Sequence, residues 1–210
     1  MVKISVSILS KNNNETILKL NDTNCDYLHI DVMDGKFVSE TQFSCSRIEE
    51  ISLAAKPKLD VHLMVEQPSA YIDNLPLAKV EYITIHYETL NGDISIINYI
   101  KNKGIKCGLS IKPNTDIRVL FPLLKFIDLV LIMSVEPGRG GQTFMSDTLN
   151  KVRLLKTEII KEQVSTIISI DGGINNDNAK LCVDAGCDML VSGSYITNSE
   201  DYQIAVDNLR

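Results

Sequence analysis

The stretch TIISIDGGINNDNAKLCVDAGCDMLVSG (residues 166–193) contains one complete strand–helix–strand unit and decides the fold. Residues 166–171 and 188–193 are short, mostly apolar runs, which is typical of strands buried on both faces. Between them, apolar residues at helical spacing predict a helix over 176–185, and Gly186 stands where a helix-terminating glycine is expected. A helix that connects two strands in this way makes them parallel and the crossover right-handed.

The same alternation of apolar run and helical segment recurs along the whole chain. The other runs lie at 3–9, 26–32, 58–65, 81–86, 105–111 and 127–134, and further helices are expected at 94–102 and 146–161. Eight such units in 210 residues predict an α/β protein with a (β/α)8 TIM barrel. An open, doubly wound parallel sheet is the alternative. No linker or change in composition divides the chain, so we expect a single domain over residues 1–210.

The composition is that of a folded globular protein and excludes a disordered chain or a coiled coil. Of the 210 residues, 44% are hydrophobic and 23% charged, which is enough apolar material for a sizeable core. The formal net charge is -6, and a surplus of acid disfavours binding to nucleic acid or to an anionic membrane surface. We therefore expect no nucleic-acid partner and no membrane partner.

Cysteine usage and the length of the apolar runs bear on the compartment. The five cysteines are scattered and form no C-x-x-C pair, which is typical of reduced thiols in a cytosol. The longest apolar run, 126–133, contains Asp128 and is far shorter than the ~20 residues that span a bilayer. The first residues also lack the pattern of an export signal. We expect a cytoplasmic protein.

Polar side chains stand at the C-terminal ends of three predicted strands, where barrel enzymes carry their active sites. His29 and Asp31 belong to the second strand, His62 to the third and Asp171 to the seventh. Alternation along a strand turns His29 and Asp31 to the same side. A single histidine on a buried strand is usually a core residue, but the chain has only three histidines and two of them fall in this set. We expect the four side chains to converge on one mouth of the barrel.

Two imidazoles and two carboxylates suit a borderline divalent ion such as Zn²⁺, Fe²⁺, Mn²⁺ or Co²⁺. No thiol stands at these strand ends, so a closed structural zinc site is not indicated. We expect one catalytic divalent metal ion per chain. The third histidine, His86, ends the fourth predicted strand. The sequence leaves open whether His86 supports the site, lines the pocket or only packs in the core.

Glycine-rich loops follow the last two predicted strands. Gly172 and Gly173 follow the seventh strand, and Gly193 and Ser194 follow the eighth. Many barrels bind phosphate at these two loops, because glycine lets backbone N–H groups approach the oxygens closely. A tight turn explains either pair alone. Together the two pairs predict a phosphate site.

A third cluster of glycines follows the sixth predicted strand. Gly138, Gly140 and Gly141 surround Arg139, and so many glycines favour a mobile lid over a tight turn. The sequence leaves open whether Arg139 contacts substrate or is solvated.

Three methionines also fall at strand ends, at positions 33, 64 and 133. Methionine usually fills gaps in a core. At one mouth the three side chains would instead form walls that exclude water, and the sequence favours neither role.

At these residues the chain resembles the ribulose-phosphate 3-epimerase family, and the resemblance extends essentially from end to end. The strings that carry it are SILS (7–10), HIDVMDGKFV (29–38), DVHLMV (60–65), MSVEPGRGGQTF (133–144) and IDGGI (170–174). Their order and spacing are similar to the successive signatures of that family, and the set as a whole is highly specific.

The resemblance implies a barrel enzyme that interconverts D-ribulose 5-phosphate and D-xylulose 5-phosphate in the pentose phosphate pathway. It implies a divalent metal held by His29, Asp31, His62 and Asp171, with Asp31 and Asp171 as the acid and base. The residues implied to contact the sugar phosphate are Ser7, His62, Gly138, Gly140, Gly141, Gly172, Gly173, Gly193 and Ser194. From their positions at strand ends, the candidates for the pocket wall are Met33, Met64 and Met133. We also expect a homo-oligomer.

The chain departs from the family's pattern beside the site. Lys11-Asn12-Asn13 follows SILS where A-D-F is usual, and Lys36, Ser39 and Glu40 interrupt the usual H-F-V-P-N. Arg139 stands where an aromatic residue is common. These changes spare the expected ligands and carboxylates but put the shape of the sugar pocket in doubt. A related hexulose-phosphate 3-epimerase, for example one acting on allulose 6-phosphate, is the main alternative, followed by a non-catalytic barrel that binds phosphate and metal.

Overall fold

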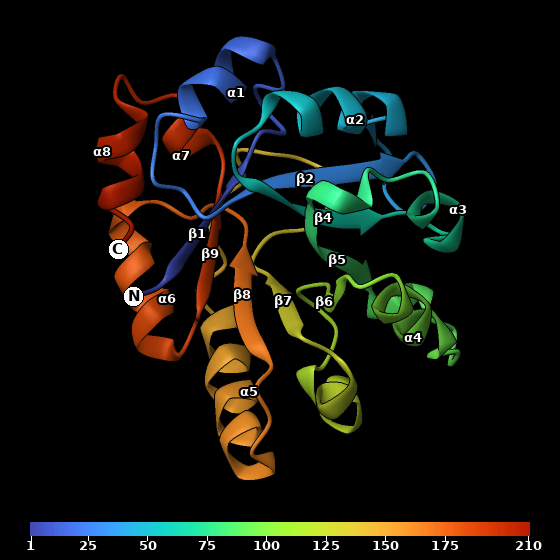
Figure 1. The fold of residues 1–210 in the computed structure, drawn as a ribbon. Coiled ribbons are helices and arrows are strands. Elements are labelled where there is room, and N and C mark those ends of the chain that lie inside the picture. The colour runs from blue at the N-terminus through green and yellow to red at the C-terminus, as the bar shows by residue number, and fades with distance from the viewer.

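A computed structural model of the protein describes residues 1–210 and shows parallel strands around a central axis with helices outside them (Figure 1). The strands are β1 (Lys3–Ser7), β2 (Tyr27–Asp34), β3 (Thr41–Gln42), β4 (Lys58–Met64), β5 (Val80–His86), β6 (Lys106–Ile111), β7 (Leu129–Met133), β8 (Ile167–Asp171) and β9 (Met189–Ser192). They form a nine-stranded sheet in the order β1-β9-β8-β7-β6-β5-β4-β2-β3, and β1 also pairs with β2. This pairing closes the barrel, so the (β/α)8 prediction is confirmed and the open sheet is excluded.

The strand β3 is the one strand that the sequence pattern did not predict. It consists of two residues and pairs antiparallel with the end of β2, with Thr41 opposite Asp34 and Gln42 opposite Met33. Two residues are too few to show a strand's alternation. The β3 strand fixes the segment that follows β2 against the active mouth of the barrel.

The helices cover the outside of the barrel (Figure 1). They are α1 (Asn14–Leu20), α2 (Cys45–Ala54), α3 (Ser69–Ile72), α4 (Ser95–Asn102), α5 (Thr148–Glu162), α6 (Asn176–Ala185), α7 (Ser194–Thr197) and α8 (Tyr202–Asp207), with 3₁₀ segments at Leu77–Lys79, Tyr87–Thr89 and Ile117–Phe126. The last segment replaces an α-helix between β6 and β7, and it contains Pro122, which has no N–H to donate to an α-helical ladder. None of these helices combines the length and the apolar composition needed to cross a membrane.

Helix α6 shows why the unit at 166–193 folds as its sequence predicts. Asn175 and Asn178 form a reciprocal capping box at its start. Gly186 ends the helix in the left-handed region, with φ of 119°, a conformation that costs little only for glycine. The predicted helix over 176–185 and its terminating glycine are both confirmed.

The strands pack apolar side chains on both faces. The outward side chains and the helices share one large core, which includes Ile30, Val61 and Ile132. A smaller apolar cluster, with Tyr82 and Leu131, fills the inside of the barrel. Buried polar side chains lie inside as well, toward the carboxyl ends of the strands. The interior therefore changes from an apolar floor to a polar mouth, and this mouth is where the candidate site lies.

Candidate active site

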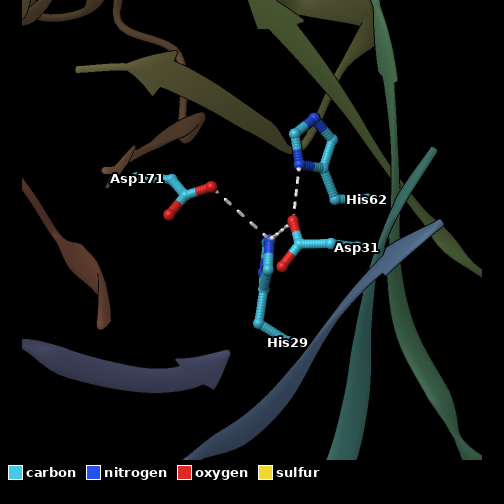
Figure 2. Close-up of side chains that lie close together, drawn as sticks. All are labelled: His29, Asp31, His62 and Asp171. Carbon is cyan, nitrogen blue, oxygen red and sulfur yellow. Dashed lines mark ion pairs between the residues drawn. The ribbon is translucent and has the colours of Figure 1, made fainter. Parts of the chain in front are cut away.

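Four side chains meet at the mouth of the barrel, as the sequence predicts (Figure 2). His29 and Asp31 come from β2, His62 from β4 and Asp171 from β8. Oδ1 of Asp31 lies 3.3 Å from Nε2 of His29 and 3.4 Å from Nδ1 of His62. Oδ2 of Asp171 lies 3.9 Å from the same nitrogen of His29. One ligand atom from each residue falls within 4.8 Å of all the others.

The donor atoms of this group fit a divalent metal. Nε2 of His29 and Nδ1 of His62 are buried and form no hydrogen bond, although each lies near a carboxylate oxygen. Buried polar atoms are rarely left without a partner, and an ion is one explanation for such a pair. Two imidazole nitrogens and two carboxylate oxygens match the preferences of Zn²⁺ and its neighbours in the first transition series. The four predicted ligands could therefore hold a metal ion together.

The far side of the His29 ring contacts a second carboxylate. Nδ1 of His29 lies 2.8 Å from Oδ2 of Asp60, and the hydroxyl of Ser5 donates a 2.8 Å hydrogen bond to the same oxygen. Asp60 is 2% exposed. Sequence reasoning did not single out Asp60, although the parallel register pairs it directly with His29 and a register argument could have found it.

The far side of the His62 ring contacts a histidine instead. Nε2 of His62 lies 2.9 Å from Nε2 of His86, and Nδ1 of His86 lies 3.2 Å from Oε2 of Glu88. His86 is fully buried and does not line the pocket. The structure thus places His86 behind His62, in support of the candidate site, which was one of the roles that the sequence left open. Glu88 was not singled out, because it lies in a 3₁₀ turn after the strand, beyond any strand periodicity.

Burial and neighbouring charges set the ionisation of the imidazoles. Burial favours neutral His29, but the carboxylates of Asp31 and Asp60 outweigh it and raise the pKa of His29 well above its ordinary value. Burial lowers the pKa of His62, and it lowers the pKa of His86 to about 4. His86 is therefore neutral at physiological pH.

The two carboxyl groups of the site have opposite shifts in pKa. Burial opposes ionisation of Asp31, but the charge of His29 and close contacts to both imidazoles hold the pKa of Asp31 far below its usual range. Burial and the nearby charge of Asp31 instead raise the pKa of Asp171 to about 7. An ionised carboxylate and a carboxyl that can hold a proton near neutrality therefore share one mouth, as acid–base chemistry requires.

A pocket opens above these carboxylates and gathers almost all of the predicted substrate contacts. Its lining includes Ser7, Asp31, Met33, Met64, Met133, Gly138, Gly140, Gly141, Asp171, Gly172, Gly173, Gly193 and Ser194. The three methionines are 1–2% exposed and lie in the wall. His62, which was expected to contact substrate as well as metal, is fully buried and does not line the pocket.

The glycine loops after β8 and β9 present free amides to this pocket. The backbone N–H groups of Gly172, Gly173, Gly193 and Ser194 donate no hydrogen bond within the chain. Gly173 has φ of +65°, and a Cβ there would lie 2.6 Å from the backbone nitrogen of Phe144. Glycine is needed at that position because of this backbone contact and the positive φ. The free amides are suited to an anionic group.

The loop expected to act as a lid lines the pocket, pairs with the segment after β2 and is braced by hydrogen bonds within itself. Arg139 lies 3.3 Å from Oε1 of Glu40 in the segment after β2. The side-chain amide of Gln142 donates to the backbone oxygens of Glu136 and Arg139 at 2.7 and 2.8 Å. Arg139 thus pairs with an acidic side chain of this chain and stays largely exposed. Movement of the loop stays a prediction.

Comparison with known proteins agrees with this geometry. The model of the ribulose-phosphate 3 epimerase family matches residues 3–197. The chain is 36% identical to a ribulose-phosphate 3-epimerase of Methanocaldococcus jannaschii, over 100% of this chain and 90% of that protein. It is 34% identical to one of Bacillus subtilis, over 100% and 99%, and 37% identical to one of Helicobacter pylori, over 90% and 87%.

Solved structures with low sequence identity share the fold alone. A phosphoribosylanthranilate isomerase of Thermotoga maritima superposes with a TM-score of 0.69 at 14% identity, covering 100% of this chain and 96% of that one. A 3-hexulose-6-phosphate synthase superposes with a TM-score of 0.67 at 14% identity, covering 99% and 97%. The matching family model and the relatives at 34–37% identity show the family as well as the fold. The chain belongs to the ribulose-phosphate 3-epimerase family.

Proposed function

We propose that this protein is an isomerase that interconverts D-ribulose 5-phosphate and D-xylulose 5-phosphate, a reaction of the pentose phosphate pathway. The observation that carries the proposal is the pair Asp31 and Asp171, which reach one pocket from β2 and β8 with opposite shifts in pKa. The names of the full-length relatives support the same activity. Epimerisation next to a ketone needs such a pair, because one group removes the proton and another returns it on the opposite face.

Asp31 and Asp171 take complementary parts in this mechanism. Asp31 is ionised and accepts the proton from C3, and its Oδ2 is held by a 2.8 Å hydrogen bond from Ser7. Asp171 carries a proton near neutral pH and delivers it to the other face of the same carbon. In the reverse reaction the two roles exchange, as microscopic reversibility requires.

The residues that would hold the metal are His29, Asp31, His62 and Asp171, with one ion per chain. When bound, a divalent ion such as Zn²⁺, Fe²⁺, Mn²⁺ or Co²⁺ supplies Lewis-acid stabilisation of the negative charge that develops on the substrate's oxygens. The unpartnered nitrogens of His29 and His62 support this assignment.

The free amides of Gly172, Gly173, Gly193 and Ser194 would bind the phosphate of the substrate. Binding the phosphate at this end orients C3 between the two carboxyls and contributes energy remote from the reacting carbon. The methionine walls and the loop over 137–142 would keep water away from the intermediate. Gly138, Gly140 and Gly141 bring this loop against the sugar.

A hexulose-phosphate 3-epimerase uses the same chemistry on a longer sugar, so the width of the pocket decides between the two. Glu40 and Arg139 pair beside the loop over 137–142, and the names of the full-length relatives favour the shorter pentulose. A coupled assay on D-ribulose 5-phosphate and D-allulose 6-phosphate tests this choice. We expect a higher kcat/KM for the pentulose, and faster turnover of the hexulose would overturn the substrate assignment.

We further propose a cytoplasmic homo-oligomer that binds neither nucleic acid nor membrane. All five cysteines are free thiols and four are buried, which supports a reducing compartment. Leu53, Ile160 and Ile204, on α2, α5 and α8, are 84%, 67% and 58% exposed, and contact with further copies would cover such apolar side chains. The net charge of -6 supports the absence of a polyanionic partner.

A further inference from the structure

We propose that His86 and Glu88 are positioning residues that keep the proton of His62 on Nε2 and so leave Nδ1 of His62 free to bind the metal. The proposal rests on the metal site proposed above and extends it to two residues that do not line the pocket. It assigns a function to the histidine whose role the sequence left open.

The first step is the hydrogen bond between the two rings. Nε2 of His62 and Nε2 of His86 face each other at 2.9 Å, and both residues are fully buried. One nitrogen must donate a proton and the other must accept it, because two protonated nitrogens repel and two bare ones form no bond. A neutral imidazole carries one proton, so the direction of this bond decides which nitrogen of each ring has a free lone pair. If His62 donates, its free lone pair is on Nδ1, which points toward Asp31.

The second step is the carboxylate that fixes this direction. Oε2 of Glu88 lies 3.2 Å from Nδ1 of His86. Oε1 of Glu88 accepts a 2.9 Å hydrogen bond from the backbone N–H of Lys112 and another from the hydroxyl of Thr115. Burial opposes ionisation of Glu88, but these hydrogen bonds and the one from His86 lower the pKa of Glu88 to about 2. A carboxylate only accepts, so His86 carries its proton on Nδ1, accepts on Nε2, and requires His62 to donate.

Packing holds the three groups in one arrangement. The rings of His62 and His86 stack with centroids 5.0 Å apart and planes inclined by 29°. The ring of Phe37, from the segment after β2, also contacts the ring of His86, with centroids 4.5 Å apart. The ammonium of Lys112 lies 4.1 Å from the centroid of Phe37. These contacts enclose His86 and disfavour rotation of its ring. The proton order set by Glu88 is therefore passed to His62.

Replacing Glu88 by glutamine separates this role from simple packing, because the two side chains have nearly the same shape. In Glu88→Gln the amide oxygen keeps the hydrogen bonds from Lys112 and Thr115, so the amide NH₂ faces Nδ1 of His86. That nitrogen must then accept, the proton of His86 moves to Nε2, and His62 is driven to carry its proton on Nδ1. An isosteric change at Glu88, which reaches His62 only through His86, would thus block Nδ1 of His62.

The test measures metal binding and tautomers directly and does not depend on turnover. Affinity for Zn²⁺ and for Co²⁺ is determined by chelator competition in the wild type and in Glu88→Gln, with Glu81→Gln as the matched control. Glu81 lies on the same strand, β5, and pairs with Lys58 and Lys106 far from the imidazoles. We expect affinity to fall about 10-fold to 100-fold in Glu88→Gln and to be unchanged in Glu81→Gln.

Imidazole ¹⁵N chemical shifts in the metal-free protein report the tautomers, and only three histidines need assignment. We expect His62 protonated on Nε2 and His86 on Nδ1 in the wild type, with both reversed in Glu88→Gln. If the variant does not fold, the tautomers of His62 and His86 measured in the wild type alone still test the proposal.

The outcomes distinguish failure of the proton order set by Glu88 and His86 on His62, here called the relay, from failure of the metal site itself. If the wild type binds neither ion, the proposed metal site and the relay both fail. If the wild type binds metal and Glu88→Gln binds it equally well, the relay alone is overturned. A wild-type His62 protonated on Nδ1 overturns the relay too.

Discussion

The hydroxyl of Ser7 donates a 2.8 Å hydrogen bond to Oδ2 of Asp31, whereas the imidazoles of His29 and His62 both approach the other oxygen, Oδ1. The two oxygens of one carboxylate are thus divided between two tasks. Oδ1 faces the nitrogens that would bind the metal, and Oδ2 is fixed by β1 at the edge of the pocket. Ser7 therefore orients the proposed base, in addition to its expected contact with substrate.

Removing this hydroxyl should slow the reaction without dissociating the metal. Ser7→Ala loses one charge-assisted hydrogen bond to Asp31, so we expect kcat to fall about tenfold while the Zn²⁺ content stays constant. Steady-state kinetics with metal analysis of the same samples measures this. Ser10→Ala, at an exposed position in the same pocket, is the control and should leave kcat unchanged. Wild-type kcat in Ser7→Ala would show that Asp31 needs no such support.

Removal of the metal should abolish turnover reversibly. A chelator withdraws the ion, and we expect activity to return when Zn²⁺, Fe²⁺, Mn²⁺ or Co²⁺ is added, because the four proposed ligands offer two nitrogens and two oxygens. His62→Ala should lose both metal and turnover while keeping the barrel's circular dichroism spectrum, since strand-end residues at this face serve function more than packing. Full activity in a preparation shown to be metal-free would refute the cofactor assignment.

A charge placed at the proposed phosphate site should weaken substrate binding selectively. Ser194→Asp sets a carboxylate beside the free amides of Gly193 and Gly173, so we expect KM for the sugar phosphate to rise about tenfold or more. Ser194→Asn has the same size without the charge and should change KM little. Inorganic phosphate should inhibit the wild type competitively and inhibit Ser194→Asp less. Equal KM values in the two variants would contradict this assignment and indicate that other loops bind the phosphate.

The raised pKa of Asp171 predicts a cost in stability that depends on pH. The ordinary pKa of this carboxyl is 3.8 and that in the folded protein about 7, so its contribution to stability is complete below pH 3.8 and is lost as pH rises through 7. Three pH units correspond to about 4 kcal/mol. Metal-free Asp171→Asn should therefore unfold at higher urea concentration than the wild type at pH 8.

The same comparison at pH 4 supplies the check on this sign. Most of the advantage of Asp171→Asn should be lost there, because the folded wild-type chain then holds the proton and pH 4 lies close to the ordinary pKa of 3.8 that governs the unfolded chain. Asp147→Asn, at an exposed position, controls for the loss of one charge. A difference between wild type and Asp171→Asn that is the same at pH 4 and pH 8 would exclude a raised pKa at Asp171.

Much of the barrel and its mouth could be predicted from the sequence, because strand and helix periodicities are local. The spacing of His29 and Asp31 places both on one face of β2, and parallel strands bring His62 and Asp171 to the same end. The partners behind the ligands depend on register instead. Asp60 meets His29 only because β2 and β4 pair with those two residues opposite each other.

Side-chain contacts between loops lie beyond such patterns. Glu88 reaches His86 from a 3₁₀ turn, and its own position depends on Lys112 and Thr115, which follow the next strand. The pairing of Arg139 with Glu40 likewise joins two loops about a hundred residues apart in sequence. No periodicity links such positions, so only the folded structure reveals them.

The most direct test of the two-carboxyl mechanism is exchange of the C3 proton with solvent deuterium in Asp31→Asn and Asp171→Asn. Each variant keeps one base, so each should fail to epimerise yet still exchange the C3 proton of a single epimer, and the two variants should prefer opposite epimers. Metal content is measured on the same samples, because both residues are proposed ligands. Loss of the ion from either variant would stop exchange of the C3 proton in both epimers. Opposite preferences in metal-replete variants are the result that we expect. Equal exchange of both epimers, or near-wild-type epimerisation by either variant, would contradict the assignment of one carboxyl to each face.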